Sequence, residues 1–220
     1  ALVGGGTVPR PGEITLAHRG VLFLDEFPEF PRSVLEALRQ PLEDGVITVS
    51  RAQGSVTFPA RFSLIASSNP CPCGYTGDTE KNCVCSPGQV IKYRRRVSGP
   101  LLDRIDIHVE VPRVKVDHLT GTELGESSAL VRLRVAKARE RQGQRFKQAR
   151  LPFMCNAEMG AREIKVFCAM TDELQNFMRQ AVSQFHLSAR SYHRVLKVAR
   201  TIADLKGEIA LNMEHLAEAL

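Results

Sequence analysis

The stretch Val21-Leu22-Phe23-Leu24-Asp25-Glu26-Phe27 decides the predicted fold of the N-terminal half of the chain. Its four consecutive large apolar residues, bounded by Gly20 and Pro28, are typical of a short strand buried on both faces of a parallel sheet. Asp25 and Glu26 then stand at the carboxyl end of this strand, the edge where open α/β sheets bind ligands. Burying carboxylates is costly unless a cation or a strong donor compensates. Asp25 is therefore predicted to hold Mg²⁺ on a nucleotide phosphate through water, and Glu26 to orient and polarise the attacking water. The alternative is a strand that ends in a solvated acidic turn.

A second apolar run, Phe62–Ala66, predicts another buried strand, which stops at Ser67-Ser68-Asn69-Pro70. An Asn before a Pro is often only a turn former. Beside a metal-bound phosphate, however, an uncharged amide can hydrogen-bond both the phosphate and the attacking water. We therefore expect Asn69 to lie at the same sheet edge as Asp25 and Glu26.

Four cysteines follow in two close pairs, Cys71-Pro72-Cys73 and Cys83-Val84-Cys85. Four thiolates form a complete tetrahedral ligand set for a structural Zn²⁺, and such a closed site would have no catalytic role. The pairs have one intervening residue, whereas zinc pairs usually have two to four. Free thiols, or a disulfide formed on oxidation, are the alternatives.

The rest of the chain divides into a mixed segment and a helical one. Two β-prone runs, Val46–Val49 and Ser55–Phe58, predict a hairpin with Arg51 near its tip, either as a solvated charge or in contact with a polyanion. The Gly- and Pro-rich residues 1–19 predict a loop or hairpin insert. The other predicted elements are helices over 31–42 and 89–97, a strand over 105–111, a linker over 113–125 and helices over 127–146, 161–169, 172–185, 189–204 and 213–220.

Composition sets broad limits on function. The 220 residues are 43% hydrophobic and 25% charged, which are ordinary values for a globular protein. A net charge of +6 favours an anionic partner. No apolar run approaches the length of a membrane span, and the six cysteines do not suggest a secreted disulfide framework, so a cytoplasmic protein is expected. Because the chain begins at Ala1 without a methionine, we expect it to be a piece of a longer protein.

Four phrases carry a family resemblance: GVLFLDEFPEFPRSVLEALRQPLEDG at 20–45, SSNPCPCG at 67–74, SGPLLDRIDIHVEVP at 98–112 and LSARSYHRVLKVARTIADL at 187–205. Together they resemble the magnesium-chelatase-like branch of the AAA+ ATPases, and within it the ComM/YifB-like competence proteins. The resemblance covers essentially the whole chain. It implies the C-terminal half of an α/β AAA+ core with a parallel sheet over 1–112, the linker over 113–125 and an all-helical lid subdomain over 126–220.

The resemblance also implies roles for single residues. Asp25 and Glu26 resemble the Walker B pair, Asn69 the sensor 1 residue, Arg104 the arginine finger and Arg190 the sensor 2 residue. The hairpin that carries Arg51 resembles the pre-sensor 1 hairpin, which lines the central pore of this clade. The family's Walker A strand and phosphate loop would lie upstream of Ala1, so these 220 residues alone are expected to bind ATP weakly or not at all.

The function implied is that of an ATP- and Mg²⁺-dependent motor. Members of this subfamily are expected to assemble as homohexamers and to move on or remodel DNA, as in branch migration during natural transformation. One alternative is a chelatase-type or chaperone-type ATPase that remodels a protein or tetrapyrrole complex. Another, of a different class, is a zinc-stabilised binding module without enzymatic activity.

Overall fold

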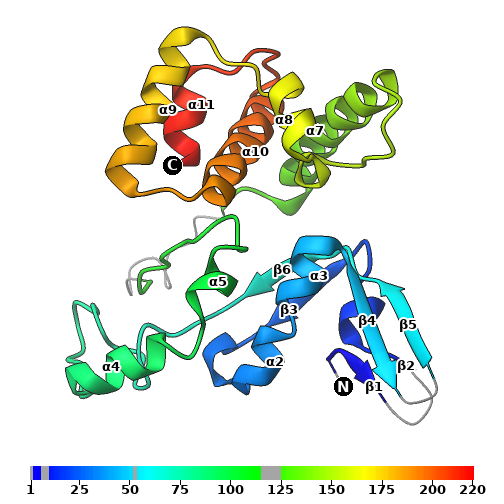
Figure 1. Cartoon of the computed structure of the whole chain (residues 1–220). Coiled ribbons are helices and arrows are strands. Elements are labelled where there is room, and N and C mark those ends of the chain that lie inside the picture. Colours follow the sequence, from blue (N-terminus) through cyan, green and yellow to red (C-terminus); the bar gives the residue numbers. More distant parts are fainter. Residues whose placement is uncertain (1, 6–9, 52–53, 115–124) are drawn as a thin grey trace. The chain divides into compact units, whose positions relative to one another are not determined.

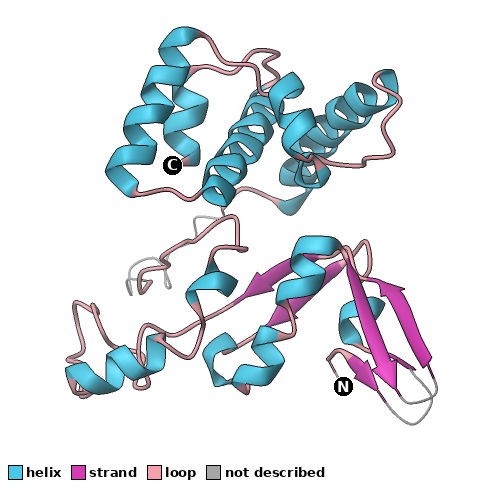
Figure 2. Ribbon diagram, viewed as in Figure 1, coloured by secondary structure: helices cyan, strands magenta, loops and turns pink. Residues whose placement is uncertain are grey.

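The computed structural model describes residues 2–5, 10–51, 54–114 and 125–220. It divides into two compact units, Ala1–Arg113 and Val114–Leu220 (Figure 1). The described part of the first unit mixes helices and strands, whereas that of the second contains helices and loops (Figure 2).

A two-stranded parallel sheet lies at the centre of the first unit. β3 (Val21–Leu24) pairs with β6 (Ser63–Ala66) in the register Val21↔Ser63 to Leu24↔Ala66. The predicted parallel arrangement is therefore confirmed, and both strands end at the same edge. The predicted hairpin is also confirmed, as β4 (Val46–Arg51) paired antiparallel with β5 (Gly54–Pro59). The other elements of this unit are β1 (Gly4–Gly5), β2 (Arg10–Pro11), α1 (Glu13–Leu16), η1 (Phe27–Glu29), α2 (Arg32–Glu36), α3 (Arg39–Asp44), α4 (Pro87–Arg94) and α5 (Gly99–Leu102).

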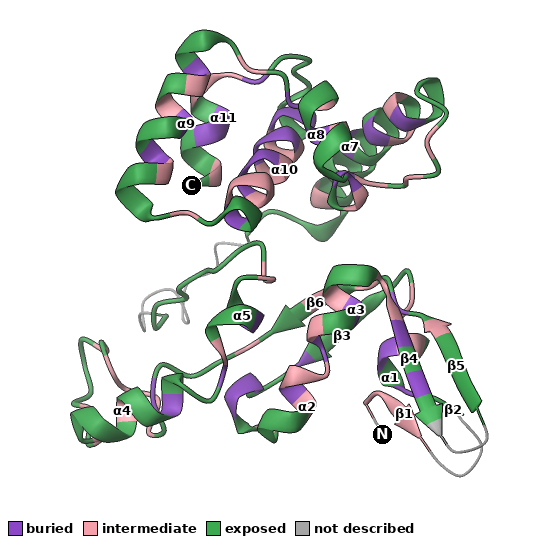
Figure 3. Cartoon of the chain, in the orientation of Figure 1, coloured by how far each residue is buried: buried purple, intermediate pink, exposed green. Residues whose placement is uncertain are grey.

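Burial of β3 differs from the prediction. Leu22 and Leu24 are buried in a core that includes Leu35, between β3 and the helices that follow it, whereas Val21 and Phe23 are 58% and 59% exposed (Figure 3). The prediction that this strand is buried on both faces is therefore wrong. The described helices pack on the face that carries Leu22 and Leu24, and no described element covers the opposite face.

Two other predicted elements take a different form. The helix expected over 31–42 is broken into α2 and α3, because Pro41 lacks an N–H and its ring clashes with the carbonyl of Ala37, where the break falls. The strand expected over 105–111 is wrong: its residues form no ladder, and Ile107, Val109 and Val111 are exposed. A strand needs a hydrogen-bonding partner, and no described strand pairs with this segment.

The second unit is a helical bundle around α10 (Ala189–Lys206), which contacts α7, α8 and α11. Its core includes Phe146, Met178, Leu196 and Leu216. Ser188 caps α10: its hydroxyl accepts the backbone N–H of Ser191 at 3.1 Å. The remaining elements are α7 (Ser128–Gln148), η2 (Asn156–Glu158), α8 (Ala161–Phe167), α9 (Asp172–Phe185) and α11 (Met213–Ala219).

An ionic cluster is buried in this bundle, and the sequence did not reveal it. The Asp204 carboxylate, 1% exposed, forms ion pairs with Arg145 and with Arg200, which is itself 2% exposed. Asn156 also donates to Asp204, at 2.8 Å. The cluster joins α7, η2 and α10, and it buries most of the Arg145 side chain, one of the many basic residues of α7. None of the described helices has the length and apolar character needed to cross a membrane.

Candidate functional site

The acidic pair stands directly at the end of β3, as predicted. Asp25 Oδ1 accepts the backbone N–H of Glu26 at 3.0 Å and the hydroxyl of Ser67, the first residue after β6. Within the described residues no hydrogen bond reaches Oδ2 of Asp25. One carboxylate oxygen is thus held by the neighbouring strand, while the other is available to a ligand.

Glu26 lies in an unusual backbone conformation. Its φ is +51° and its ψ is +45°, in the left-handed region that a residue with a side chain seldom adopts. Its N–H reaches the Ser67 hydroxyl at 3.1 Å, and the N–H of Phe27 donates to the Ser67 carbonyl at 2.8 Å. These bonds hold Glu26 in a left-handed conformation, which costs about 1–3 kcal/mol for a residue with a side chain. Residues strained in this way cluster at functional sites. The Glu26 carboxylate itself is exposed.

Asn69 follows β6 by three residues and is exposed at the same end of the sheet. Its side chain forms no hydrogen bond with Asp25 or Glu26 among the described residues, so its catalytic role stays a prediction. Ser67 is the residue that the sequence reasoning missed: its hydroxyl and its carbonyl both tie the end of β6 to the acidic turn. A serine at a strand end carries no distinctive signal, because it is also a common turn residue.

Arg104 is engaged within its own unit. It forms an ion pair with Glu43 of α3, and its Nη1 donates to the Pro100 carbonyl at 2.5 Å. Its side chain is only 10% exposed. An arginine finger acts on a neighbouring subunit's nucleotide. In this structure the Arg104 guanidinium instead contacts Glu43 and Pro100 of its own unit.

The two other predicted arginines lie apart from the acidic pair in the sequence and in the elements that carry them. Arg190 is exposed in the first turn of α10, in the second unit. Arg51 is the last residue of β4, opposite Gly54. Its side chain, together with residues 52 and 53 at the hairpin tip, lies outside the described residues. The sensor 2 and DNA-contact roles therefore stay predictions.

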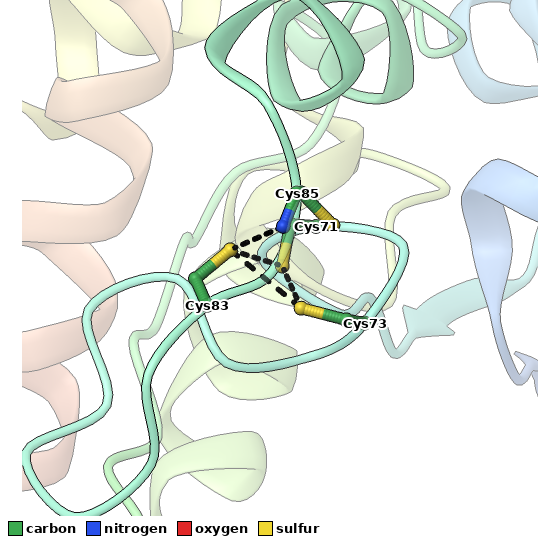
Figure 4. A group of neighbouring side chains, drawn as sticks. All are labelled: Cys71, Cys73, Cys83 and Cys85. Atoms are coloured by element: carbon green, nitrogen blue, oxygen red, sulfur yellow. Dashed lines mark hydrogen bonds between the residues drawn. The ribbon is translucent and has the colours of Figure 1, made fainter.

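The four cysteines of the loop after β6 are brought together. Their sulfur atoms all lie within 4.8 Å of one another. Cys71 Sγ is 3.4 Å from Cys73 Sγ and 3.7 Å from Cys83 Sγ, and Cys73 Sγ is 3.6 Å from Cys83 Sγ. In Figure 4 dashed lines join the sulfurs of Cys71, Cys73 and Cys83, and Cys85 lies beside them. None of them is joined in a disulfide.

These thiols differ in acidity. Burial alone would raise the pKa of Cys71, but hydrogen bonds from Thr76 and from the neighbouring thiols lower it to about 5. Burial, together with hydrogen bonds from the three neighbouring thiols, raises the pKa of Cys85 to about 12. The cluster is therefore a polar group of unequal acids rather than a set of inert core cysteines.

A basic pocket opens between the turn after η1 and α4. It has a volume of about 400 Å³ and is lined by Arg32, Lys92, Arg95 and Arg96, with Glu29 as its one carboxylate. Arg96 pairs with Glu29. In the described part of the chain neither Lys92 nor Arg95 forms an ion pair, so the pocket carries net positive charge.

Comparison with known proteins assigns this arrangement to a family. The sequence model of "Magnesium chelatase, subunit ChlI" matches residues 1–119, and that of the ChlI C-terminal region matches residues 125–220. The chain belongs to the magnesium chelatase ChlI family. Its α/β unit with a parallel sheet, followed by a helical part, is the AAA+-type arrangement of this family.

Individual relatives within the ChlI family are longer than this chain. It is 51% identical to competence protein ComM of Haemophilus influenzae and 46% identical to the protein YifB of Escherichia coli, in each case over 100% of this chain and 42% of the relative. It is 37% identical to magnesium-chelatase subunit ChlI of Bigelowiella natans over 52% of this chain and 26% of that protein. The chain thus spans less than half the length of these relatives.

Proposed function

We propose that this chain is part of an ATP-driven AAA+ motor that acts as a hexamer and remodels DNA in natural transformation or recombination. The observation that carries the proposal is the sheet edge where Asp25 and Glu26 meet the end of β6, in a chain of the magnesium chelatase ChlI family. The similarity to competence protein ComM supports the choice of DNA as the substrate.

The residues at this edge suit a nucleotide carried with Mg²⁺. Carboxylate and hydroxyl oxygens are hard ligands of the kind that Mg²⁺ prefers, and Asp25 and Ser67 supply one of each. When bound, Mg²⁺ would neutralise charge on the phosphates of ATP. Asp25 would hold it through Oδ2, because Oδ1 is already engaged by Ser67.

Glu26 is assigned the task of orienting and deprotonating the attacking water. Its carboxylate is exposed, and the bonds that Ser67 makes with the turn fix the backbone from which it projects. Asn69 would hold the same water and a phosphate oxygen through its amide. Arg104 would act on a neighbouring subunit's nucleotide once its pair with Glu43 opens, and Arg190 would contact phosphate from the helical unit.

Positive surface supports a polyanionic partner. The pocket of Arg32, Lys92, Arg95 and Arg96 presents four cations against one carboxylate. Arg51, at the end of β4, is proposed to contact backbone phosphates of DNA. The four cysteines are proposed to hold one structural Zn²⁺.

The experiment uses the product of the complete open reading frame and the variant Glu26→Gln. ATP hydrolysis should fall by about 10²–10⁴-fold, the usual contribution of a general base, while binding of a fluorescent ATP analogue is retained. Glu29→Gln, the same change three residues along the chain, is the matched control and should keep turnover, because Glu29 pairs with Arg96 at the surface. Equal loss of turnover in both variants would contradict the assignment.

DNA dependence separates this function from its main competitor. A motor on DNA should hydrolyse ATP faster when DNA is added, and Arg51→Ala should reduce the salt dependence of DNA binding by about one phosphate contact, a slope change of roughly 0.9 on duplex DNA. The competitor is a chelatase-type or chaperone-type ATPase acting on a protein, which the ChlI relative favours. ATPase activity that ignores DNA would support that competitor.

A further inference from the structure

The cysteine loop, residues 71–85, affects the geometry of the sheet edge. Only the role of Asn69 in this inference rests on the proposed function. We infer that Cys71, Cys73, Cys83 and Cys85 bind one Zn²⁺, and that this metal fixes the position of Asn69 beside the acidic pair. In this reading the cysteines are positioning residues, which act through Asn69 and take no part in the reaction.

The sulfur positions match the ligand sphere of one zinc ion. Zinc–sulfur bonds of about 2.3 Å in a regular tetrahedron place the sulfurs roughly 3.8 Å apart. The observed separations among Cys71, Cys73 and Cys83 are 3.4, 3.7 and 3.6 Å, and Cys85 Sγ lies within 4.8 Å of all three. A disulfide would need about 2.05 Å, so the cluster is not poised as two disulfides.

The chemistry of the ligands selects the metal class. Four sulfur ligands around a single point favour zinc or iron, and they disfavour Mg²⁺ and Ca²⁺, which take oxygen ligands. Nearby N–H and O–H groups also approach the sulfurs. The backbone N–H of Thr76 points at Cys71 Sγ and that of Cys85 at Cys83 Sγ, both at 3.4 Å, and the Thr76 hydroxyl lies 3.1 Å from Cys83 Sγ. Such outer contacts orient thiolate ligands and spread their negative charge.

The cysteine loop begins at Cys71, two residues after Asn69. On the N-terminal side of Asn69 the chain is held to the sheet, because the Ser67 N–H donates to the Leu24 carbonyl at 3.0 Å. Between Asn69 and the loop stands Pro70, whose ring fixes its φ and whose carbonyl accepts Nε of Arg94 from α4 at 3.4 Å. Cys71 then comes next and is fully buried. Asn69 therefore lies on a short segment with β3 fixing one end and the cysteine cluster fixing the other.

The loop has few other restraints. Asp78 accepts the N–H groups of Glu80 and Lys81, and its carboxylate faces Arg113 at 3.6 Å. These contacts shape the tip of the loop but do not hold its two ends together. Among the described residues, the contacts that join the two ends of the loop run between the cysteines, with Thr76 adding one to Cys83. Removing the metal should thus release the C-terminal side of Asn69, and a shift of about 1 Å in a positioning group can reduce a rate by roughly 10²-fold.

The first test measures the metal on the 220-residue chain, expressed without chelator. Elemental analysis should find one zinc per chain in the wild type, and none in Cys71→Ser or Cys83→Ser. Cys155→Ser is the matched control: the same substitution in the helical unit, outside the cluster, should leave one zinc per chain. Absence of metal, iron in place of zinc, or zinc that survives both cluster substitutions would overturn the inference.

The second test reads position without relying on activity. Hydrogen exchange of the wild-type chain is compared before and after zinc is removed by a chelator, and again after zinc is restored, so that no variant has to fold. Exchange at the amides of residues 67–76 should accelerate at least tenfold and reverse with zinc, while amides of α9 and α10 keep their rates. Acceleration confined to residues 73–85 would show a metal that shapes the loop alone, and would refute the positioning of Asn69.

The third test connects the metal to the proposed function. In the complete open reading frame, Cys71→Ser should lower kcat for ATP by about tenfold or more and change KM by a smaller factor, since Asn69 is only one of several proposed nucleotide contacts. An unchanged kcat with zinc lost would refute the positioning role. If the wild-type protein itself hydrolyses no ATP, the proposed function fails, while the first two tests still judge the zinc site and its effect on residues 67–76.

Discussion

Replacing Asp204 by Asn should destabilise the helical unit more than any comparable surface change. The Asp204 carboxylate is 1% exposed and pairs with Arg145 and Arg200, whose side chains are 19% and 2% exposed. Asn keeps the shape of Asp but removes the charge that both guanidinium groups share. The substitution would leave two cations in the bundle without a counter-charge.

The size of the effect follows from this burial. Removing one partner of a buried ion pair typically costs about 3–5 kcal/mol, because the remaining charge stays desolvated. For a unit of roughly 100 residues, each kcal/mol lowers Tm by about 4–8 °C, so Tm should fall by roughly 12 °C or more. Arg200 cannot relax into solvent easily, because it also donates to the carbonyl of Ile209 at 2.6 Å.

The assay is thermal unfolding followed by circular dichroism at the helix band, to which α7, α9 and α10 of the second unit contribute most. The matched control is Glu126→Gln, the same loss of charge at a pair with Arg134 whose side chains are 43% and 52% exposed, and it should leave Tm unchanged. Adding Arg145→Met to the Asp204→Asn variant should recover part of the loss. Asp204→Asn with the Tm of the control would refute the view that this cluster holds the bundle together.

Three further predictions concern the first unit. Arg95→Ala should weaken DNA binding and lower its salt dependence by about one contact, whereas Arg94→Ala, one residue away but outside the basic pocket, should change it less, as measured by fluorescence anisotropy at several salt concentrations. Glu43→Gln should raise ATP hydrolysis by the assembled complete protein if Arg104 acts on a neighbour's nucleotide; a lower Tm with an unchanged rate would show that the pair is only structural. Backbone N–H groups hold the pKa of Asp78 below its usual 3.8, so its stabilising effect is fully present above about pH 4 and is lost as pH falls further; Asp78→Asn should remove that part of the acid dependence in a pH-unfolding series.

Local sequence pattern predicted the architecture of the sheet edge. Two apolar runs of strand length, each followed by polar residues, were enough to anticipate β3, β6 and their shared edge, because parallel strands end on the same side. The pattern could not predict which face of β3 is exposed. Val21 and Phe23 were predicted to be core residues, but their burial depends on what packs against their face of the sheet. The described helices pack on the opposite face, which carries Leu22 and Leu24.

Long-range polar contacts were the least predictable part. Arg200 and Asp204 are four residues apart on α10, a spacing that indicates a helical ion pair. Nothing local indicates that Arg145, 59 residues earlier, completes the cluster, or that Ser67 reaches back 42 residues to Asp25. Such contacts arise from packing, and charged or hydroxyl side chains are as common on solvated surfaces. The close cysteine pairs were an exception, because four soft ligands within 15 residues restrict the loop to few arrangements.

The predicted role of Arg104 differs from the contacts that it makes in the single chain. The family resemblance implied that it acts on a neighbouring subunit's nucleotide, and its permanent charge suits that task. In the single chain the same charge must be satisfied internally, and Glu43 and the Pro100 carbonyl do so at a site that is only 10% exposed. Offering Arg104 to a partner therefore requires breaking this pair, which costs more than opening an exposed pair because Arg104 is largely desolvated. A nucleotide on the neighbouring subunit, with several phosphate charges, can offset that cost where one carboxylate of a side chain cannot. Assembly around ATP would then expose the arginine, and the pair with Glu43 would hold it back in the absence of a nucleotide-loaded neighbour.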